Sequence, residues 1–234
     1  MSSLDERAAI DALRRCPLFA PCPQGVLADV GRRLRHRHFR RNEVIFHQGD
    51  PGDALHVITS GSVKIVLPSP EGEEAIIATL RTGDFFGELS LLDGEPRSAT
   101  AVAVEATETL SLPRNVFREL LDAHPELRDA LFSALTSLLR RLTHHVEELH
   151  FLDLAGRLAA RLAQLARQAQ PRAGSGPVEL DWPYTQSDLA AMIGGTRQSV
   201  NRLLADLITD GLVRLEHERL VITDVYALER RAER

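Results

Sequence analysis

The sequence predicts an α+β chain with three parts: an N-terminal β-barrel of the jelly-roll type, a long helix suited to dimerisation, and a C-terminal winged helix-turn-helix. Three observations predict this order. Short apolar segments with glycine turns come first, a run with heptad leucines follows, and a helix, a three-residue turn, a helix and a hairpin close the chain. We therefore expect three regions, which span residues 1–125, 126–152 and 153–234.

Composition places the chain among ordinary globular proteins. Its 234 residues are 44% hydrophobic and 26% charged, which suits one large domain or two smaller ones. No apolar run approaches the ~18 residues that a membrane span needs. Residues 1–6 are acidic and lack the apolar stretch of a signal peptide. These features predict a cytoplasmic protein without a membrane partner.

The two cysteines, Cys16 and Cys22, do not predict a cofactor. Zinc sites use closer spacing and four ligands, and four-cysteine iron–sulfur clusters need more thiolates than the chain has. We expect unreactive thiols and neither a bound metal nor another cofactor. The net charge of −5 does not exclude a nucleic-acid partner, because that binding depends on where basic residues lie.

The N-terminal part alternates short strands with turn residues. Helices are expected at residues 5–15 and 23–34, and strands at residues 42–47, 54–59, 63–67, 74–80, 99–104 and 108–112. Glycine, proline and aspartate cluster in the turns between them, for example at residues 48–52 and 68–72. Short strands at this spacing are typical of a sandwich or a barrel.

Leucines recur along the central helix at heptad spacing. The row consists of Leu131, Leu135, Leu138, Leu142, Leu149 and Leu152, with His145 at the missing position and Val146 beside it. Such a row over three heptads predicts pairing with a second copy of the same helix. The alternative is a helix that packs its leucines against its own barrel.

The pattern of the C-terminal part predicts a DNA-binding domain, called the head below. Thr185 suits the cap of a helix at residues 186–193, residues 194–196 form the turn, and residues 197–210 form the second helix. Residues at the start of such a helix reach base edges or phosphates. The candidate DNA contacts are Thr185, Gln186, Thr196, Arg197, Gln198, Ser199, Asn201 and Arg202. The alternative is a polar helix face that only meets solvent.

A dense motif at residues 86–100 predicts a ligand with a phosphate and a sugar. Arg97 suits a forked contact to a phosphate, Ser98 offers a hydroxyl, and Glu88 suits a sugar hydroxyl. A helix start after Gly87 presents backbone N–H groups to the same anion. The alternative is an internal ion pair between Glu88 and Arg97 in a sensor that binds no ligand.

This motif resembles the phosphate-binding cassette of the cyclic-AMP receptor protein/Fnr family of bacterial transcription regulators. The resemblance covers essentially the whole chain, and it includes residues 151–153 at the end of the central helix and residues 196–202 in the head. It implies a homodimeric regulator, not an enzyme, that binds a palindromic operator in double-stranded DNA and contacts RNA polymerase. The implied effector is cyclic AMP or cyclic GMP, held by Gly87, Glu88, Leu89, Ser90, Arg97, Ser98, Leu142 and Thr143.

Two departures from the family pattern bear on specificity. Leu142 stands where the family offers a threonine to the adenine, and Thr143 follows as a hydroxyl donor from the partner subunit. The identity of the base therefore stays open. Gln198 stands where the best-known member has a glutamate, which shifts the expected preference at one base pair away from cytosine.

Two alternative functions remain. One is the same DNA-binding regulator without nucleotide control. The other is a metal-dependent enzyme on a cupin-like barrel, prompted by a pattern that consists of His36, His38, Glu43 and Gly49. The surrounding arginines oppose a bound cation, and no downstream histidine completes the ligand set.

Overall fold

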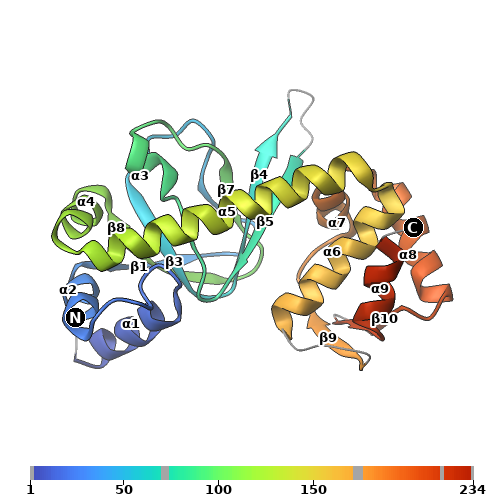
Figure 1. Ribbon diagram of the computed structural model, residues 1–234, viewed down its shortest axis with the longest axis horizontal. Coiled ribbons are helices and arrows are strands. Elements are labelled where there is room, and N and C mark those ends of the chain that lie inside the picture. The colour runs from blue at the N-terminus through green and yellow to red at the C-terminus, as the bar shows by residue number, and fades with distance from the viewer. Residues whose placement is uncertain (1–2, 70–73, 171–175, 217–218, 233–234) are drawn as a thin grey trace. The chain divides into compact units, whose positions relative to one another are not determined.

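The computed structural model describes residues 3–69, 74–170, 176–216 and 219–232 (Figure 1). The chain forms two compact units, Met1–Arg140 and Arg141–Arg234. Within the described ranges, no helix has both the length and the apolar character that crossing a bilayer requires.

Two antiparallel four-stranded sheets form the barrel of the first unit. The strand orders are β1-β8-β3-β6 and β2-β7-β4-β5. The strands of the first sheet are β1 (Arg35–Phe39), β8 (Thr107–Pro113), β3 (Ala54–Ser60) and β6 (Phe85–Phe86). Those of the second are β2 (Val44–Phe46), β7 (Thr100–Ala103), β4 (Ser62–Pro68) and β5 (Glu74–Arg81). The predicted jelly-roll barrel is confirmed.

Successive side chains of β3 serve two different cores, because side chains alternate across a strand. Leu55 and Val57 belong to a large apolar cluster that the helices cover, whereas Ile58 packs with Val63 and Phe86 between the sheets. His56 is buried on β3 as well.

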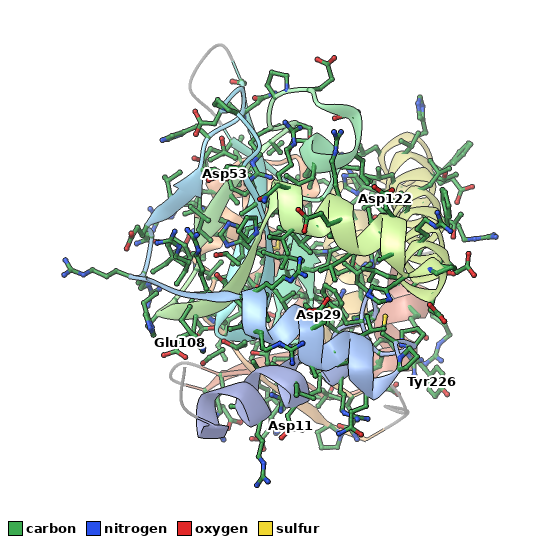
Figure 2. All side chains as sticks on the ribbon, turned by 90° about the vertical axis from the view of Figure 1, so that its left-hand side faces the viewer. Asp11, Asp29, Asp53, Glu108, Asp122 and Tyr226 are labelled. Carbon is green, nitrogen blue, oxygen red and sulfur yellow. The ribbon has the colours of Figure 1, made fainter. Side chains whose placement is uncertain are left out.

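Helices cover one side of this unit: α1 (Ser3–Arg15), α2 (Gln24–Arg33) and α4 (Arg114–Ala123). In Figure 2 the three helices can be found by the labelled residues Asp11 on α1, Asp29 on α2 and Asp122 on α4. Cys16 and Cys22 lie buried in the cluster beneath these helices, and both are free thiols. Burial raises the pKa of Cys16 to about 12, so this thiol stays protonated at neutral pH.

The central helix α5 (Pro125–Phe151) has two apolar sides. Leu127, Ala130 and Leu131 are buried, and Leu127 and Leu131 join the helix-covered core of the first unit. An exposed row runs along the helix and consists of Phe132, Leu139, Leu142, Val146 and Leu149. Leu131 therefore packs against its own unit, and Val146 rather than His145 continues the heptad spacing of the exposed row.

The second unit is a winged helix-turn-helix, as predicted. Its elements are α6 (Leu154–Ala169), β9 (Val178–Asp181), α7 (Gln186–Ile193), α8 (Arg197–Thr209), β10 (Val213–Glu216), β11 (Arg219–Ile222) and α9 (Val225–Ala232). The strands pair in the order β10-β11-β9. Helix α9 was not predicted. Glu229 of α9 accepts hydrogen bonds from Arg167 of α6 at 2.9 and 3.0 Å. This pair joins α9 to α6.

Candidate functional site

The cassette begins where β6 ends at Gly87. This residue has a φ of +85°, in the left-handed region that glycine adopts without strain. A Cβ atom at Gly87 would lie 2.7 Å from Nη1 of Arg97, which is too close. Glycine is therefore required here for two reasons: the backbone turns sharply, and the arginine packs directly against it. The short helix α3 (Leu89–Asp93) follows.

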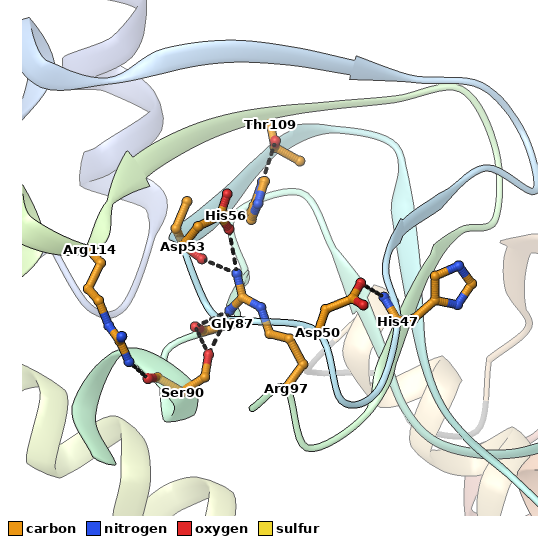
Figure 3. Close-up of polar contacts among 10 residues, drawn as sticks. His47, Asp50, Asp53, His56, Gly87, Ser90, Arg97, Thr109 and Arg114 are labelled. Carbon is orange, nitrogen blue, oxygen red and sulfur yellow. Dashed lines mark hydrogen bonds and ion pairs between the residues drawn. The ribbon is translucent and has the colours of Figure 1, made fainter. Parts of the chain in front are cut away.

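Arg97 lies at the centre of a hydrogen-bond network (Figure 3). The residue is only 3% exposed. Its Nη1 donates to the Gly87 carbonyl at 2.6 Å and to Ser90 Oγ at 2.9 Å. Its Nη2 donates to the Ala54 carbonyl at 2.8 Å and to Asp53 Oδ1 at 3.1 Å. The cassette thus holds a buried guanidinium group in one orientation.

Burial and nearby carboxylates act in opposite directions on the charged form of Arg97. Desolvation by burial lowers its pKa, and the nearby Asp53 carboxylate opposes that effect. Its Nε is buried and has no hydrogen-bond partner among the described residues. The Asp53 side chain is 87% exposed, so its ion pair with Arg97 opens to solvent. A buried cation with an unused N–H group fits an oxyanion such as a phosphate.

Asp53 is a site residue that was not among the candidates predicted from the sequence. The alternative interpretation paired Arg97 with Glu88. The structure pairs Arg97 with Asp53, and the nearby charge of Glu88 also acts to raise the pKa of Arg97. Glu88 is buried, at 8% exposure, and precedes the first residue of α3. Asp53 follows a turn at the start of β3, and such a position carries no sequence signal for a partner 44 residues away.

The other predicted ligand residues fall into two groups. Gly87, Glu88, Leu89, Ser90, Arg97 and Ser98 lie together in the cassette. Within it Ser90 is buried, whereas Leu89 and Ser98 are exposed. Leu142 and Thr143 lie on the part of α5 that belongs to the second unit.

His56 on β3 is a second buried polar residue of this barrel. Its ring stacks on Phe86, with centroids 5.1 Å apart and an interplanar angle of 12°. Its Nδ1 shares a hydrogen bond of 3.1 Å with Thr109 Oγ1. Burial lowers the pKa of His56 to about 4, and the charge of Arg97 acts in the same direction. The imidazole is therefore neutral at physiological pH.

This pKa predicts an acid-sensitive barrel. Unfolded His56 takes a proton below its ordinary pKa of 6.5, whereas the folded residue resists protonation until about pH 4. Stability is therefore lost as the pH falls through this window, by roughly 2 kcal/mol at pH 5 relative to pH 7.5. Urea unfolding of the wild type and of His56→Gln, at both pH values, measures the difference. Equal losses of stability in the two proteins would rule out His56 as the cause.

In the second unit, capping residues delimit α7 and mark the start of α8. Thr185 caps α7 and forms a reciprocal capping box with Asp188. Gly194 ends the helix in the left-handed region, and Nη1 of Arg157 donates to the Ile193 carbonyl at 2.9 Å. Thr196 then caps α8, accepting from the backbone N–H of Ser199 at 3.1 Å. These contacts fix the direction in which α8 leaves the turn.

Helix α8 separates a buried face from an exposed one. Val200, Leu204 and Leu207 are buried in the unit. The exposed side chains in its first two turns include Arg197, Gln198, Asn201 and Arg202. Thr185 and Thr196 are exposed at the helix starts, while Gln186 and Ser199 are partly buried. The predicted DNA contacts therefore lie along α8 and at the beginning of α7.

The histidine pattern that prompted a metal-enzyme reading lies elsewhere. His36 and His38 are exposed on β1, and His38 Nδ1 lies 3.3 Å from Glu108 of the neighbouring strand. Within the described part of the chain, no group of at least three histidine, cysteine or acidic residues is arranged to hold a metal ion.

A sensor barrel with a buried arginine, followed by a winged helix-turn-helix, defines the class of DNA-binding regulators with a ligand-sensing domain. The cyclic nucleotide-binding domain family matches residues 36–124, and the Crp-like helix-turn-helix domain family matches residues 156–231. The chain belongs to the CRP/Fnr family of transcription regulators.

Known proteins resemble this chain over most of its length. The CRP-like cAMP-activated global transcriptional regulator of Mycobacterium tuberculosis is 33% identical over 95% of this chain and 99% of its own length. The cyclic AMP receptor protein of Thermus thermophilus is 35% identical over 84% of this chain and 87% of its own length. The structure of FixK2 from Bradyrhizobium japonicum covers 84% of this chain and 96% of its own, with a TM-score of 0.75 at 21% identity, and supports the fold.

Proposed function

We propose that this transcription regulator works as a homodimer that binds a palindromic operator when a cyclic nucleotide, cyclic AMP or a relative, occupies the cassette. The observation that carries the proposal is the buried Arg97, held against Gly87 with an unused Nε. It acts by binding, without catalysis, in the cytoplasm, where DNA and RNA polymerase are its partners. The names of the relatives from M. tuberculosis and T. thermophilus support cyclic AMP as the first effector to test.

Nucleotide binding would exchange the partners of Arg97. A cyclic phosphate accepts a forked pair of hydrogen bonds from a guanidinium group. Asp53 now occupies Nη2 of Arg97, so the phosphate would compete with this carboxylate for the same N–H group. Ser98, exposed beside Arg97, would add a hydroxyl contact, and Glu88 would accept a hydrogen bond from the ribose.

The base of the nucleotide would meet α5. Leu142 offers no hydrogen bond to an adenine, whereas Thr143 carries the hydroxyl that would contact it from the partner subunit. Cyclic AMP and cyclic GMP are therefore separate arms of the binding experiment. We expect an apolar contact from Leu142 to either base.

DNA recognition would use the exposed side of α8. Arginine forks onto guanine, and glutamine pairs with adenine, so Arg197 and Gln198 would read base edges in the major groove. Arg202 and Asn201 would extend this surface, and the hydroxyls of Thr185 and Ser199 would meet phosphates together with Gln186 and Thr196.

Dimerisation would bury the exposed row of α5. Paired apolar rows with heptad spacing form a parallel seam between two helices. Two copies of α8 would then read half-sites about one turn of DNA apart, which requires a palindromic operator.

The decisive experiment measures operator binding by the full-length protein. Operators are selected from random DNA with the purified protein, and affinity is then measured by fluorescence anisotropy without nucleotide, with cyclic AMP and with cyclic GMP. We expect one nucleotide to tighten binding at least tenfold. The variant Arg197→Ala is expected to lose about 1–3 kcal/mol of operator binding with the nucleotide present.

A second candidate, the same regulator without nucleotide control, also has a structural basis. Both Nη atoms of Arg97 already bind groups of the protein. Under this reading, operator affinity is identical with and without either nucleotide.

A further inference from the structure

Two arginines of α4 bind the last carbonyls of the cassette helix. Arg114 Nη2 donates to the carbonyl of Ser90. Arg118 donates from Nε to the Leu91 carbonyl at 3.2 Å and from Nη2 to the Leu92 carbonyl at 3.4 Å. The Ser90 carbonyl also accepts the backbone N–H of the cap residue Gly94 at 3.2 Å. The final carbonyls of a helix lack partners further along it, so Arg118 supplies donors to the Leu91 and Leu92 carbonyls, and Arg114 adds a second donor at Ser90.

Apolar packing joins the same elements. Arg114 and Arg118 are four residues apart and share one side of α4. Leu91 of α3 is fully buried in the cluster that also holds Phe117 of α4 and Leu127 of α5. Helix α5 begins directly after α4, at Pro125. Helix α3, helix α4 and the first turn of α5 thus pack as one body.

The network around Arg97 reaches Arg114 by two routes, and Figure 3 marks the one through Ser90. Ser90 accepts from Arg97 at its Oγ and from Arg114 at its carbonyl. Asp53 accepts from Arg97 at its carboxylate, and its carbonyl accepts the backbone N–H of Arg114 at 2.8 Å. Any exchange of the partners of Arg97 therefore acts on the two residues that also hold Arg114.

We infer that Arg114 and Arg118 are positioning residues. When the hydrogen-bond partners of Arg97 change, these two arginines transmit the resulting movement of the cassette to α4 and the start of α5. The inference rests on the proposed function, because the event that starts the movement is a nucleotide phosphate that displaces Asp53 from Arg97. When Ser90 and Asp53 shift, Arg114 and Arg118 carry the movement of α3 into α4 because they bind its terminal carbonyls. Neither arginine needs to touch the ligand.

The first test uses Arg118→Ala in the full-length protein, because Arg118 is exposed and its loss leaves the core intact. We expect the affinities for cyclic AMP alone and for DNA alone to stay within about threefold of wild type. The factor by which cyclic AMP tightens DNA binding should fall at least fivefold, because about fivefold is the lower end of typical allosteric coupling. Arg118→Lys should recover part of it, and Arg128→Ala, which removes an exposed charge from α5, should have no effect. An undiminished nucleotide effect in Arg118→Ala would overturn the inference.

The second test needs no nucleotide. Amide hydrogen exchange of α4 is measured in the wild type, Arg97→Ala, Arg118→Ala and the double variant. Coupling predicts that Arg97→Ala speeds exchange in α4 at least threefold in the wild-type background and has little effect once Arg118 is gone. If Arg97→Ala does not fold, Ser90→Ala replaces it, since it removes one contact of Arg97. If the effects of the two substitutions on exchange in α4 are additive, the inference is overturned. If they are non-additive but the protein binds no nucleotide, the inference stands and only the proposed regulation by a nucleotide is rejected.

Discussion

Replacing Arg97 with alanine is expected to weaken cyclic-nucleotide binding at least about 100-fold. Each hydrogen bond from a guanidinium group to a phosphate contributes about 1.5–3 kcal/mol, so two of them account for a loss of this size. Calorimetric titration of the full-length protein, first with cyclic AMP and then with cyclic GMP, measures the change. No heat from the wild type with either nucleotide would favour the regulator without nucleotide control.

Folding has to be separated from binding in this experiment. Arg97 also donates hydrogen bonds to the carbonyls of Gly87 and Ala54. In Arg97→Ala each carbonyl loses this donor, which lowers the stability of the fold by about 1–3 kcal/mol per carbonyl if water cannot take its place. Thermal unfolding without nucleotide shows whether Arg97→Ala still folds. Asp53→Asn is the matched control, because it removes the ion pair and keeps the guanidinium group. We expect this variant to bind the nucleotide at least as tightly as wild type.

Replacing Val146 with glutamate is expected to raise the dissociation constant of the dimer at least about 100-fold. Val146 is 53% exposed and lies between Leu142 and Leu149 in the exposed row. A two-fold pairing would bring one new carboxylate from each copy into the apolar seam, where charge burial costs several kcal/mol. Analytical ultracentrifugation across a dilution series gives the dissociation constant.

Arg141→Glu is the control for the dimer experiment. Arg141 is exposed on the same helix but lies outside the exposed row, so a glutamate there should leave the dimer unchanged. Operator binding should fall together with dimerisation in Val146→Glu, since a monomer reads one half-site only. A Val146→Glu protein that sediments as the wild type does would contradict the proposed dimer surface.

Elements with strong local signals were predicted closely. The expected bounds of α7 agree with the structure, because Thr185 and Gly194 delimit the helix. The central helix, expected at residues 126–152, spans Pro125–Phe151. Helix α9 was missed, because it depends on its contacts with α6.

By itself, the sequence determined the order of the barrel, the central helix and the winged helix-turn-helix, and it singled out Arg97, because glycine turns, heptad spacing and caps act between neighbours in the chain. Only the tertiary structure decided which groups Arg97 contacts and which side of α5 stays exposed. Asp53 reaches Arg97 across 44 residues, and Arg114 reaches Ser90 across 24. Such pairs follow from the folding of separate strands and helices onto one another, and no local pattern encodes them.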